Sequence, residues 1–550
     1  MTLNPTWRNR LFAAGAAVAA VWLGIAVANG QLLVPSLIGG GFALFLLARL
    51  APWPLAAVLV IAVNAGYILG NRGFAQLYLS PSVPLLPAEM VLLVGGGLFV
   101  VQGAMRRELP FRREALNFAV LAWMGIGVLR IGFDTREYGG LALRDFALVY
   151  YAVFFFLAQG LAREARARGA FDTMLRFTCG SLLVLYPVYA QFPDFFFDVL
   201  AWRGTPLIYY KGDLVATSLA IGAVLLYLRF EERKRWWQLA LALALAGSVL
   251  AYNSRAAMLG LGVATGWLLL GGYWRFAAAQ AVAGVLGVAL ILAFAAATRT
   301  PWQRTPLFNL YERVVSIADP MGVRTYQGSD TFSKGDNNLY RAVWWRAVFD
   351  ETMEGNPYLG LGFGHDLAAR FVRLYYPDND EFNVRSPHNV LLTVFARMGA
   401  VGLAAFLAII GLVGVRTWQA VRGGRGGRTG RTSLSGHPAL PAPPALPALP
   451  AGERLRETGL WCTAWIILTS ACLGVVLEGP MGAVVFWTVL GFASGRAAVR
   501  RAAVRRAEAD ATHDAATSAV IGEVISPATL SPAKPALPSA AARPELLPSP

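Results

Sequence analysis

The feature that most constrains this 550-residue chain is the recurrence, from end to end, of apolar runs about 20 residues long. A helix needs roughly this length to cross the hydrocarbon core of a bilayer. Hydrophobic residues make up 56% of the sequence and charged residues only 15%, whereas a soluble domain carries about 25% charge. We therefore predict an all-α polytopic membrane protein with about 14 transmembrane helices.

The expected spans fill the first half of the chain and resume after one long polar interruption. They lie near residues 11–28, 31–49, 52–70, 88–104, 115–133, 145–162, 172–191, 213–229, 238–252, 256–272, 277–297, 389–415, 458–475 and 480–496. The chain divides accordingly into N-terminal transmembrane helices (1–297), a large loop (298–388), C-terminal transmembrane helices (389–496) interrupted by a Gly/Pro-rich linker (417–457), and a tail predicted to be disordered (497–550).

The net charge of +16 could suggest a nucleic-acid partner, but the basic residues fall in short clusters between apolar runs. Such clusters are typical of the cytoplasmic loops of membrane proteins, so nucleic acid is not an expected partner. The orientation that places these clusters inside puts both termini in the cytoplasm. The large loop is then periplasmic, and the protein is expected to be a multi-pass protein of the cell inner (plasma) membrane.

The large loop holds most of the polar residues that could perform chemistry. A connection of about 90 residues without structure would be unusual, so a loop this long is expected to be functional. Arg341 and Arg346 fall in a predicted amphipathic helix over 337–349 that follows Asp336, although their spacing does not place them on one helical face. The glycine-rich stretch 355–364 predicts either a functional loop or a tight structural turn.

His388 lies where the loop re-enters the membrane, between Pro387 and Asn389. It could cap the following helix, or it could take a proton near neutral pH, as imidazole does best. Arg255 lies at the outer boundary of a span, where an arginine either extends to the interface or binds an anion. Arg255 and Arg341 could form a basic pocket for an anionic head group, together with several of the other basic residues on the outer side, which are Arg130, Arg144, Arg203 and Lys211.

No metal site is predicted. The four histidines are scattered, and the three cysteines, Cys179, Cys462 and Cys472, lie in apolar stretches without the spacing of metal ligands. No cofactor is expected either. Neither a Walker-type sequence nor a serine–histidine–aspartate pattern occurs.

Three stretches between residues 252 and 406 together resemble the bacterial O-antigen ligase family. They are His388-Asn389 followed after nine residues by Gly399-Ala400-Val401-Gly402, Arg341-x-x-x-Trp345 followed by Pro357-Tyr358-Leu359-Gly360-Leu361-Gly362-Phe363-Gly364, and Asn253-Ser254-Arg255. The three spans after the loop are also similar to that family, whereas the proline-rich linker and long tail are additions.

The resemblance implies a GT-C-like, all-helical glycosyltransferase that acts without a metal and inverts the anomeric centre. Its donor would be a glycan on undecaprenyl diphosphate, and its acceptor lipid A–core or another glycan. Carried over to this chain, His388 would be the catalytic base, and Arg255 and Arg341 would bind the diphosphate. Arg346, Asn389 and Lys211 could also contact substrate.

Alternatives remain open at this point. A polysaccharide repeat-unit polymerase would use the same donor and a similar motif. A transporter or lipid-linked glycan flippase would predict internal repeats and polar residues near mid-membrane, and neither pattern is found. A non-enzymatic scaffold of a polysaccharide export complex would predict that His388 is dispensable.

Overall fold

Helices account for nearly all the regular structure of the described residues. The computed structural model describes residues 55–78, 85–106, 111–252, 254–319, 321–324, 326, 332–375, 385–422 and 451–524. The predicted spans 11–28 and 31–49 therefore lie outside the described residues. Among the described residues, the only strands are β1 (Ala201–Trp202) and β2 (Thr205–Pro206). They pair antiparallel, with Ala201 opposite Pro206.

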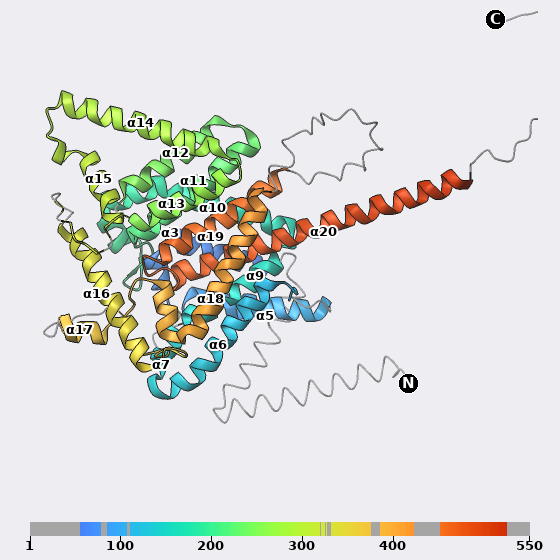
Figure 1. Ribbon diagram of the computed structural model, residues 1–550, viewed down its shortest axis with the longest axis horizontal. Coiled ribbons are helices and arrows are strands. Elements are labelled where there is room, and N and C mark those ends of the chain that lie inside the picture. Colours follow the sequence, from blue (N-terminus) through green and yellow to red (C-terminus); the bar gives the residue numbers. More distant parts are fainter. Residues whose placement is uncertain are drawn as a thin grey trace, which may run out of the picture. The chain divides into compact units, whose positions relative to one another are not determined.

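Figure 1 shows the helices of the described residues. In chain order they are α3 (Leu55–Leu69), α4 (Arg72–Ala75), α5 (Pro87–Arg106), α6 (Ala115–Tyr138), α7 (Gly140–Asp145), α8 (Ala147–Tyr150), α9 (Val153–Leu161), α10 (Ala165–Gln191), η1 (Phe195–Val199), α11 (Gly212–Arg233), α12 (Trp236–Ala251), α13 (Arg255–Leu270), α14 (Trp274–Ala297), η2 (Trp302–Arg304), α15 (Pro306–Ile317), α16 (Phe332–Gly355), α17 (Ala369–Tyr375), α18 (Val390–Arg422), α19 (Ala451–Ala471) and α20 (Pro480–Val524).

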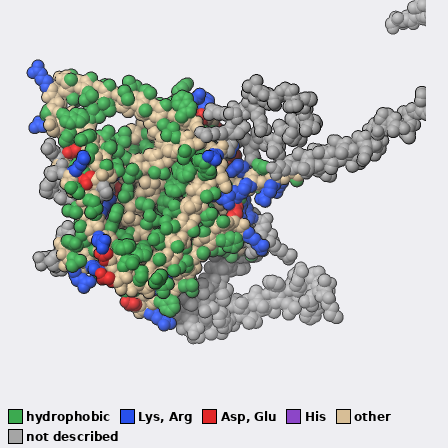
Figure 2. All heavy atoms as spheres, in the orientation of Figure 1, with side chains coloured by type: hydrophobic (Ala, Val, Ile, Leu, Met, Phe, Trp, Pro, Cys, Tyr) green, Lys and Arg blue, Asp and Glu red, His purple; other side chains and the backbone are tan. Residues whose placement is uncertain are grey.

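The lengths and composition of these helices confirm an all-α polytopic membrane protein. In the described part, seven helical segments are long and apolar enough to cross a membrane, and α3, α12 and α13 are shorter apolar helices. Figure 2 shows hydrophobic side chains covering the helices in that view, with lysines and arginines gathered toward the edges. The count of about 14 spans stays a prediction.

The helices pack around α11, which contacts α10, α12, α13 and α19. Small residues allow the close crossings: a Cβ at Gly222 would lie 3.2 Å from Cys179, and one at Gly260 only 3.0 Å from the Ile466 carbonyl oxygen. Small residues are favoured at such crossings because lipid provides no hydrophobic drive for helix association.

Buried polar side chains join helices that lie far apart in the sequence. Asn117 of α6 and Gln159 of α9 exchange two hydrogen bonds, of 2.7 and 2.9 Å, and Gln159 donates a third to Ser494 of α20 at 2.9 Å. Each partner satisfies a polar group that would be costly to leave unpaired in an apolar interior.

The described part of the large loop contains helices α15, α16 and α17 and the short helix η2. The predicted helix over 337–349 lies within α16, which begins earlier, at Phe332. Helices α15, α16 and α17 lie along one edge of the helical bundle (Figure 1, yellow). The loop is thus a small helical subdomain at one end of the spans.

Two helices in the C-terminal part extend past predicted boundaries. The linker expected over 417–457 is narrower, because α18 continues to Arg422 and α19 begins at Ala451. The tail was expected to be disordered from residue 497, yet α20 continues to Val524. The reason is local, since the segment is rich in alanine and arginine, both strong helix formers. Residues from Arg500 onward belong to a second compact unit.

Candidate active site

A cavity of about 240 Å³ opens where the loop helices meet the ends of the spans. Its wall combines the first turns of α11 and α13, the end of α15, one side of α16, and the segment after α19. The lining residues are Asp213, Ser254, Arg255, Ala256, Leu259, Ser316, Ile317, Asn338, Arg341, Trp345 and Leu473.

Arg255 reaches the cavity because it is the first residue of α13. The hydroxyl of Ser254 caps this helix by accepting from the Ala257 backbone nitrogen. The Arg255 guanidinium donates to the side-chain oxygen of Asn338 at 2.6 Å and to the Ser316 hydroxyl at 3.2 Å. Both acceptors are neutral, so neither cancels the arginine's charge.

Arg341 comes from α16 and also binds a neutral acceptor. Its guanidinium donates to the backbone carbonyl of Leu473, after α19, at 3.0 Å. Burial lowers the pKa of Arg341 from its ordinary value, but a guanidinium remains a cation in proteins. Across the described residues, no carboxylate lies within ion-pair distance of Arg255 or Arg341. The cavity therefore carries positive charge available for an anion.

His388 lies in a turn held beside this cavity. Its backbone is left-handed (φ 57°), a conformation uncommon outside glycine. The indole of Trp345, which lines the cavity, donates to the Pro387 carbonyl at 2.6 Å. The imidazole packs edge-on against Trp344, with ring centroids 5.8 Å apart. Two adjacent residues of α16 thus fix the turn and the ring.

The surroundings of His388 keep its imidazole neutral. Burial, together with the positive charges of Arg341 and Lys211, lowers the pKa of His388 to about 4. Asp213 opposes this shift but is itself 3.4 Å from the Lys211 ammonium. A neutral imidazole can accept a proton at neutral pH, as a general base must.

The glycine-rich stretch 355–364 is a tight structural turn. Gly360, Gly362 and Gly364 all have positive φ, as does Gly399 within α18. A Cβ at Gly399 would lie 2.1 Å from the Tyr358 carbonyl oxygen, so only glycine fits where the turn packs on α18. This contact explains why glycine is needed at position 399, the first residue of the Gly-Ala-Val-Gly stretch after His388.

The turn is also tied to the membrane helices. The backbone nitrogen of Phe363 donates to Asp134 of α6 at 2.7 Å, and that of Gly364 donates to Asp145 of α7 at 3.0 Å. Buried Arg397 of α18 pairs with Asp145 at 2.8 Å. The loop is thereby fixed against α6, α7 and α18.

The comparison with protein families decides the assignment. Residues 239–407 match the model of the O-antigen ligase family. This match supports the assignment of residues 239–407, here called the ligase domain, to the O-antigen ligase family. The match indicates the family of O-antigen ligase/polymerase-like membrane glycosyltransferases. This family implies a lipid-linked glycan and an acceptor as substrates in the membrane. A comparison with curated proteins gives no match.

The ligase domain contains Arg255, Arg341 and His388 but not the whole cavity. Lys211 and Asp213 at the start of α11, and Leu473 after α19, complete the site from outside the matched residues. Sequence reasoning missed Asp213 and Leu473, whose roles depend on contacts distant in the chain.

Two of the predicted substrate-binding residues have other partners in the ligase domain. The Arg346 side chain is 76% exposed and pairs with Asp350 at 2.8 Å, away from the cavity lining. The Asn389 side-chain oxygen accepts from the backbone nitrogens of Leu391 and Leu392, at 3.0 and 3.2 Å. Asn389, rather than His388, therefore caps α18, a role signalled by an asparagine before an apolar run.

Within the described ranges, no group of three or more histidine, cysteine, aspartate or glutamate side chains gathers as metal ligands would. His365, the second histidine of the loop, contacts Glu351 at 3.0 Å instead. The cavity and the turn beside it offer acid–base chemistry through His388 and electrostatic stabilisation through Arg255 and Arg341.

Proposed function

We propose that the protein transfers a glycan from undecaprenyl diphosphate to an acceptor hydroxyl at the periplasmic membrane face. The acceptor would be lipid A–core or a similar molecule, and the transfer would be metal-independent and inverting. The observation that carries this proposal is a cavity lined by two arginines with neutral partners, with a neutral histidine in the turn beside it. This arrangement suits an anionic leaving group and a hydroxyl nucleophile.

In the proposed reaction, His388 takes the proton of the acceptor hydroxyl. The acceptor oxygen attacks the anomeric carbon from the side opposite the diphosphate, and the bond between that carbon and the diphosphate oxygen breaks. Arg255 and Arg341 bind the diphosphate and stabilise the negative charge that grows on it. Lys211 adds a third cation nearby.

The proposed placement follows from the charge pattern of the loops. The large loop is periplasmic, both termini are cytoplasmic, and the protein lies in the inner membrane with about 14 spans and a GT-C-like arrangement. The donor's lipid tail then remains in the bilayer while its diphosphate enters the cavity at the membrane boundary. A repeat-unit polymerase is the alternative, with a second lipid-linked glycan as acceptor.

The test is complementation of a deletion strain, with surface glycan and membrane protein level read in parallel. His388→Ala should lower transfer by about 10²–10⁴-fold, because general base catalysis contributes that much. His365→Ala is the matched control, a histidine of the same loop paired with Glu351. Accumulated lipid-linked glycan would be full-length in a ligase defect and single repeats in a polymerase defect.

Undiminished glycan from His388→Ala, at normal protein level, would overturn the proposed chemistry. Loss of glycan from both histidine variants would point to misfolding of the loop, and His388→Gln, which keeps a polar side chain in the turn, then decides. A folded His388→Gln protein that transfers normally would exclude a base at this position.

A further inference from the structure

A second cluster of charged residues lies at the opposite end of the helical bundle. The candidate active site contacts Asp213 in the first turn of α11, whereas this cluster contacts Arg229 and Glu232 in its last turn. At 1.5 Å per helical residue, the two ends are about 24–28 Å apart. This distance approaches the roughly 30 Å of a hydrocarbon core, so the two sites face opposite membrane surfaces.

Most of this cluster consists of ion pairs that join helices. Arg496 of α20 binds Asp172 of α10 at 2.6 Å and Glu453 of α19 at 2.7 Å. Arg456 of α19 binds Glu232 of α11 at 2.8 Å. The side chain of Arg496 is only 2% exposed, so these pairs hold the ends of four helices together.

Arg176 differs from the other arginines of this cluster. Its guanidinium donates to the Thr173 hydroxyl at 3.3 Å, and no carboxylate among the described residues lies within ion-pair distance of it. The nearest candidates are already engaged, Asp172 by Arg496 and Glu232 by both Arg229 and Arg456. Arg176 thus lies near these two carboxylates but forms an ion pair with neither of them.

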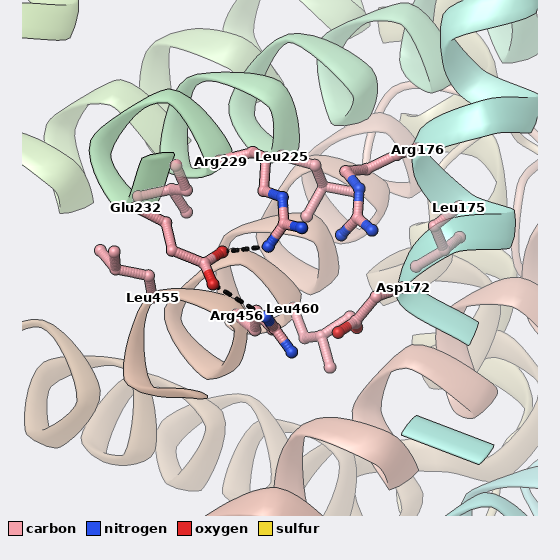
Figure 3. Close-up of a pocket in the computed structure, with 10 residues that line it drawn as sticks. Asp172, Leu175, Arg176, Leu225, Arg229, Glu232, Leu455, Arg456 and Leu460 are labelled. Atoms are coloured by element: carbon pink, nitrogen blue, oxygen red, sulfur yellow. Dashed lines mark hydrogen bonds and ion pairs between the residues drawn. The ribbon is translucent and has the colours of Figure 1, made fainter. Parts of the chain in front are cut away.

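This cation faces a small cavity. Figure 3 shows the guanidinium groups of Arg176, Arg229 and Arg456 directed toward the same space, between α10, α11 and α19. Three arginines here meet two carboxylates, and the Nε of Arg456 is buried without a hydrogen-bond partner. The cavity of about 20 Å³ admits one water-sized group, such as a single phosphate oxygen.

Exposed tryptophans place the cavity at the level of lipid head groups. Trp236 and Trp237 begin α12 just after α11 ends, and they are 73% and 56% exposed. Trp274, which begins α14, is 61% exposed. Tryptophans gather where a bilayer meets water, and basic pockets between helices at that depth bind anionic lipid head groups.

We propose that this cavity binds the phosphate of an anionic phospholipid, with Arg176 as the principal contact. One phosphate oxygen enters the space among Arg176, Arg229 and Arg456, and the rest of the head group stays at its mouth. The acyl chains then lie along α10, where Phe177 is 70% exposed. This site is distinct from the donor site and does not depend on the proposed glycan transfer.

The test is native mass spectrometry of the full-length protein in detergent, titrated with phosphatidylglycerol and, separately, phosphatidylcholine. Arg176→Ala should weaken phosphatidylglycerol binding about tenfold, the loss expected when a charge-assisted hydrogen bond is removed. Arg166→Ala, which removes an exposed arginine of the same helix, should leave binding unchanged. Phosphatidylcholine should bind more weakly, with no dependence on Arg176.

Equal phosphatidylglycerol binding by wild type and Arg176→Ala would overturn the proposal and leave the cluster as a helix clamp only. Binding of inorganic phosphate with the same dependence on Arg176, and no preference for the lipid, would overturn the assignment to a phospholipid. Arg176→Gln keeps the side-chain length without the charge, and it replaces Arg176→Ala if the shorter variant fails to fold.

Discussion

The two ends of the helical bundle use arginine differently. At the end that holds the loop, Arg255 and Arg341 donate to an amide oxygen, a hydroxyl and a backbone carbonyl. At the opposite end, Arg456 and Arg496 bind carboxylates of neighbouring helices. Neutral acceptors orient a guanidinium and leave its charge in place. A carboxylate orients the guanidinium and also cancels its charge.

This difference separates binding arginines from structural ones. A guanidinium held by neutral acceptors still attracts phosphate oxygens, so its removal should affect substrate more than stability. A buried guanidinium held by carboxylates leaves an uncompensated charge when it is removed, so stability should suffer first. Variants of arginines held by neutral acceptors and variants of arginines held by carboxylates should therefore fail in opposite ways.

The largest effect is expected from Arg496→Ala. The change leaves Asp172 and Glu453 without their partner, and breaking a buried ion pair costs about 3–5 kcal/mol. Unfolding in detergent should shift to clearly lower temperature, while the protein that remains folded transfers glycan normally. Arg275→Ala, at an exposed position of α14, is the control. An unchanged melting temperature for Arg496→Ala would contradict a structural role.

Next in size is the loss of activity from Arg341→Gln and, separately, Arg255→Gln. Removing one donor that stabilises transition-state charge costs about 2.7–4 kcal/mol, or 10²–10³-fold in rate. The measurement is kcat/KM with a lipid-linked donor, alongside thermal stability. Arg373→Gln, an exposed arginine of the same loop, should leave both values unchanged. Loss of stability without loss of rate would place Arg255 and Arg341 with the structural arginines.

The dependence of kcat/KM on pH tests whether the nearby positive charge keeps His388 neutral. Since the pKa of His388 is lowered to about 4, the imidazole stays neutral at pH 5.5. An ordinary histidine, with a pKa of about 6.5, would be roughly nine-tenths protonated there. The value of kcat/KM should therefore change less than about twofold between pH 7 and 5.5. A tenfold fall would show that His388 is not held neutral in the free enzyme.

As the pH is lowered, kcat should begin to fall at a higher pH than kcat/KM does. Bound diphosphate offsets the charge of Arg341 and Lys211, so it removes part of what lowers the pKa of His388. If kcat and kcat/KM fell at the same pH on the acid side, bound diphosphate would not change the pKa of His388. That result would contradict a diphosphate site beside His388.

The smallest effect is expected from Arg346→Ala. This side chain is 76% exposed, and its ion pair with Asp350 is of the kind worth about 0–1 kcal/mol. Transfer should stay within about twofold of wild type. A fall in transfer as large as that expected for Arg341→Gln would contradict the placement of Arg346 away from the cavity. It would support the substrate contact predicted from sequence.

The spans could be predicted because their signal is local. An apolar run long enough to cross a bilayer identifies a helix without reference to the rest of the chain. The span expected over 213–229 is found as α11, Gly212–Arg233, and that over 277–297 as α14, Trp274–Ala297. The helix after residue 497 was missed because its composition suggested disorder, although alanine and arginine favour helix.

The site could be predicted only where a motif carried it. Arg255, Arg341 and His388 were found from three short stretches, and the structure brings them to one end of the spans. The hydrogen bond from Arg341 to the Leu473 carbonyl joins residues 132 positions apart, and no local sequence pattern predicts it. Asp213 was missed for the same reason.

The most direct test of the central claim is binding of undecaprenyl diphosphate to purified wild type, Arg341→Gln and Arg456→Gln. The comparison of the two ends predicts that Arg341→Gln loses affinity at least tenfold, because each diphosphate contact is charge-assisted. Folded Arg456→Gln should bind as wild type does. Equal affinity for wild type and a folded Arg341→Gln protein would contradict the account.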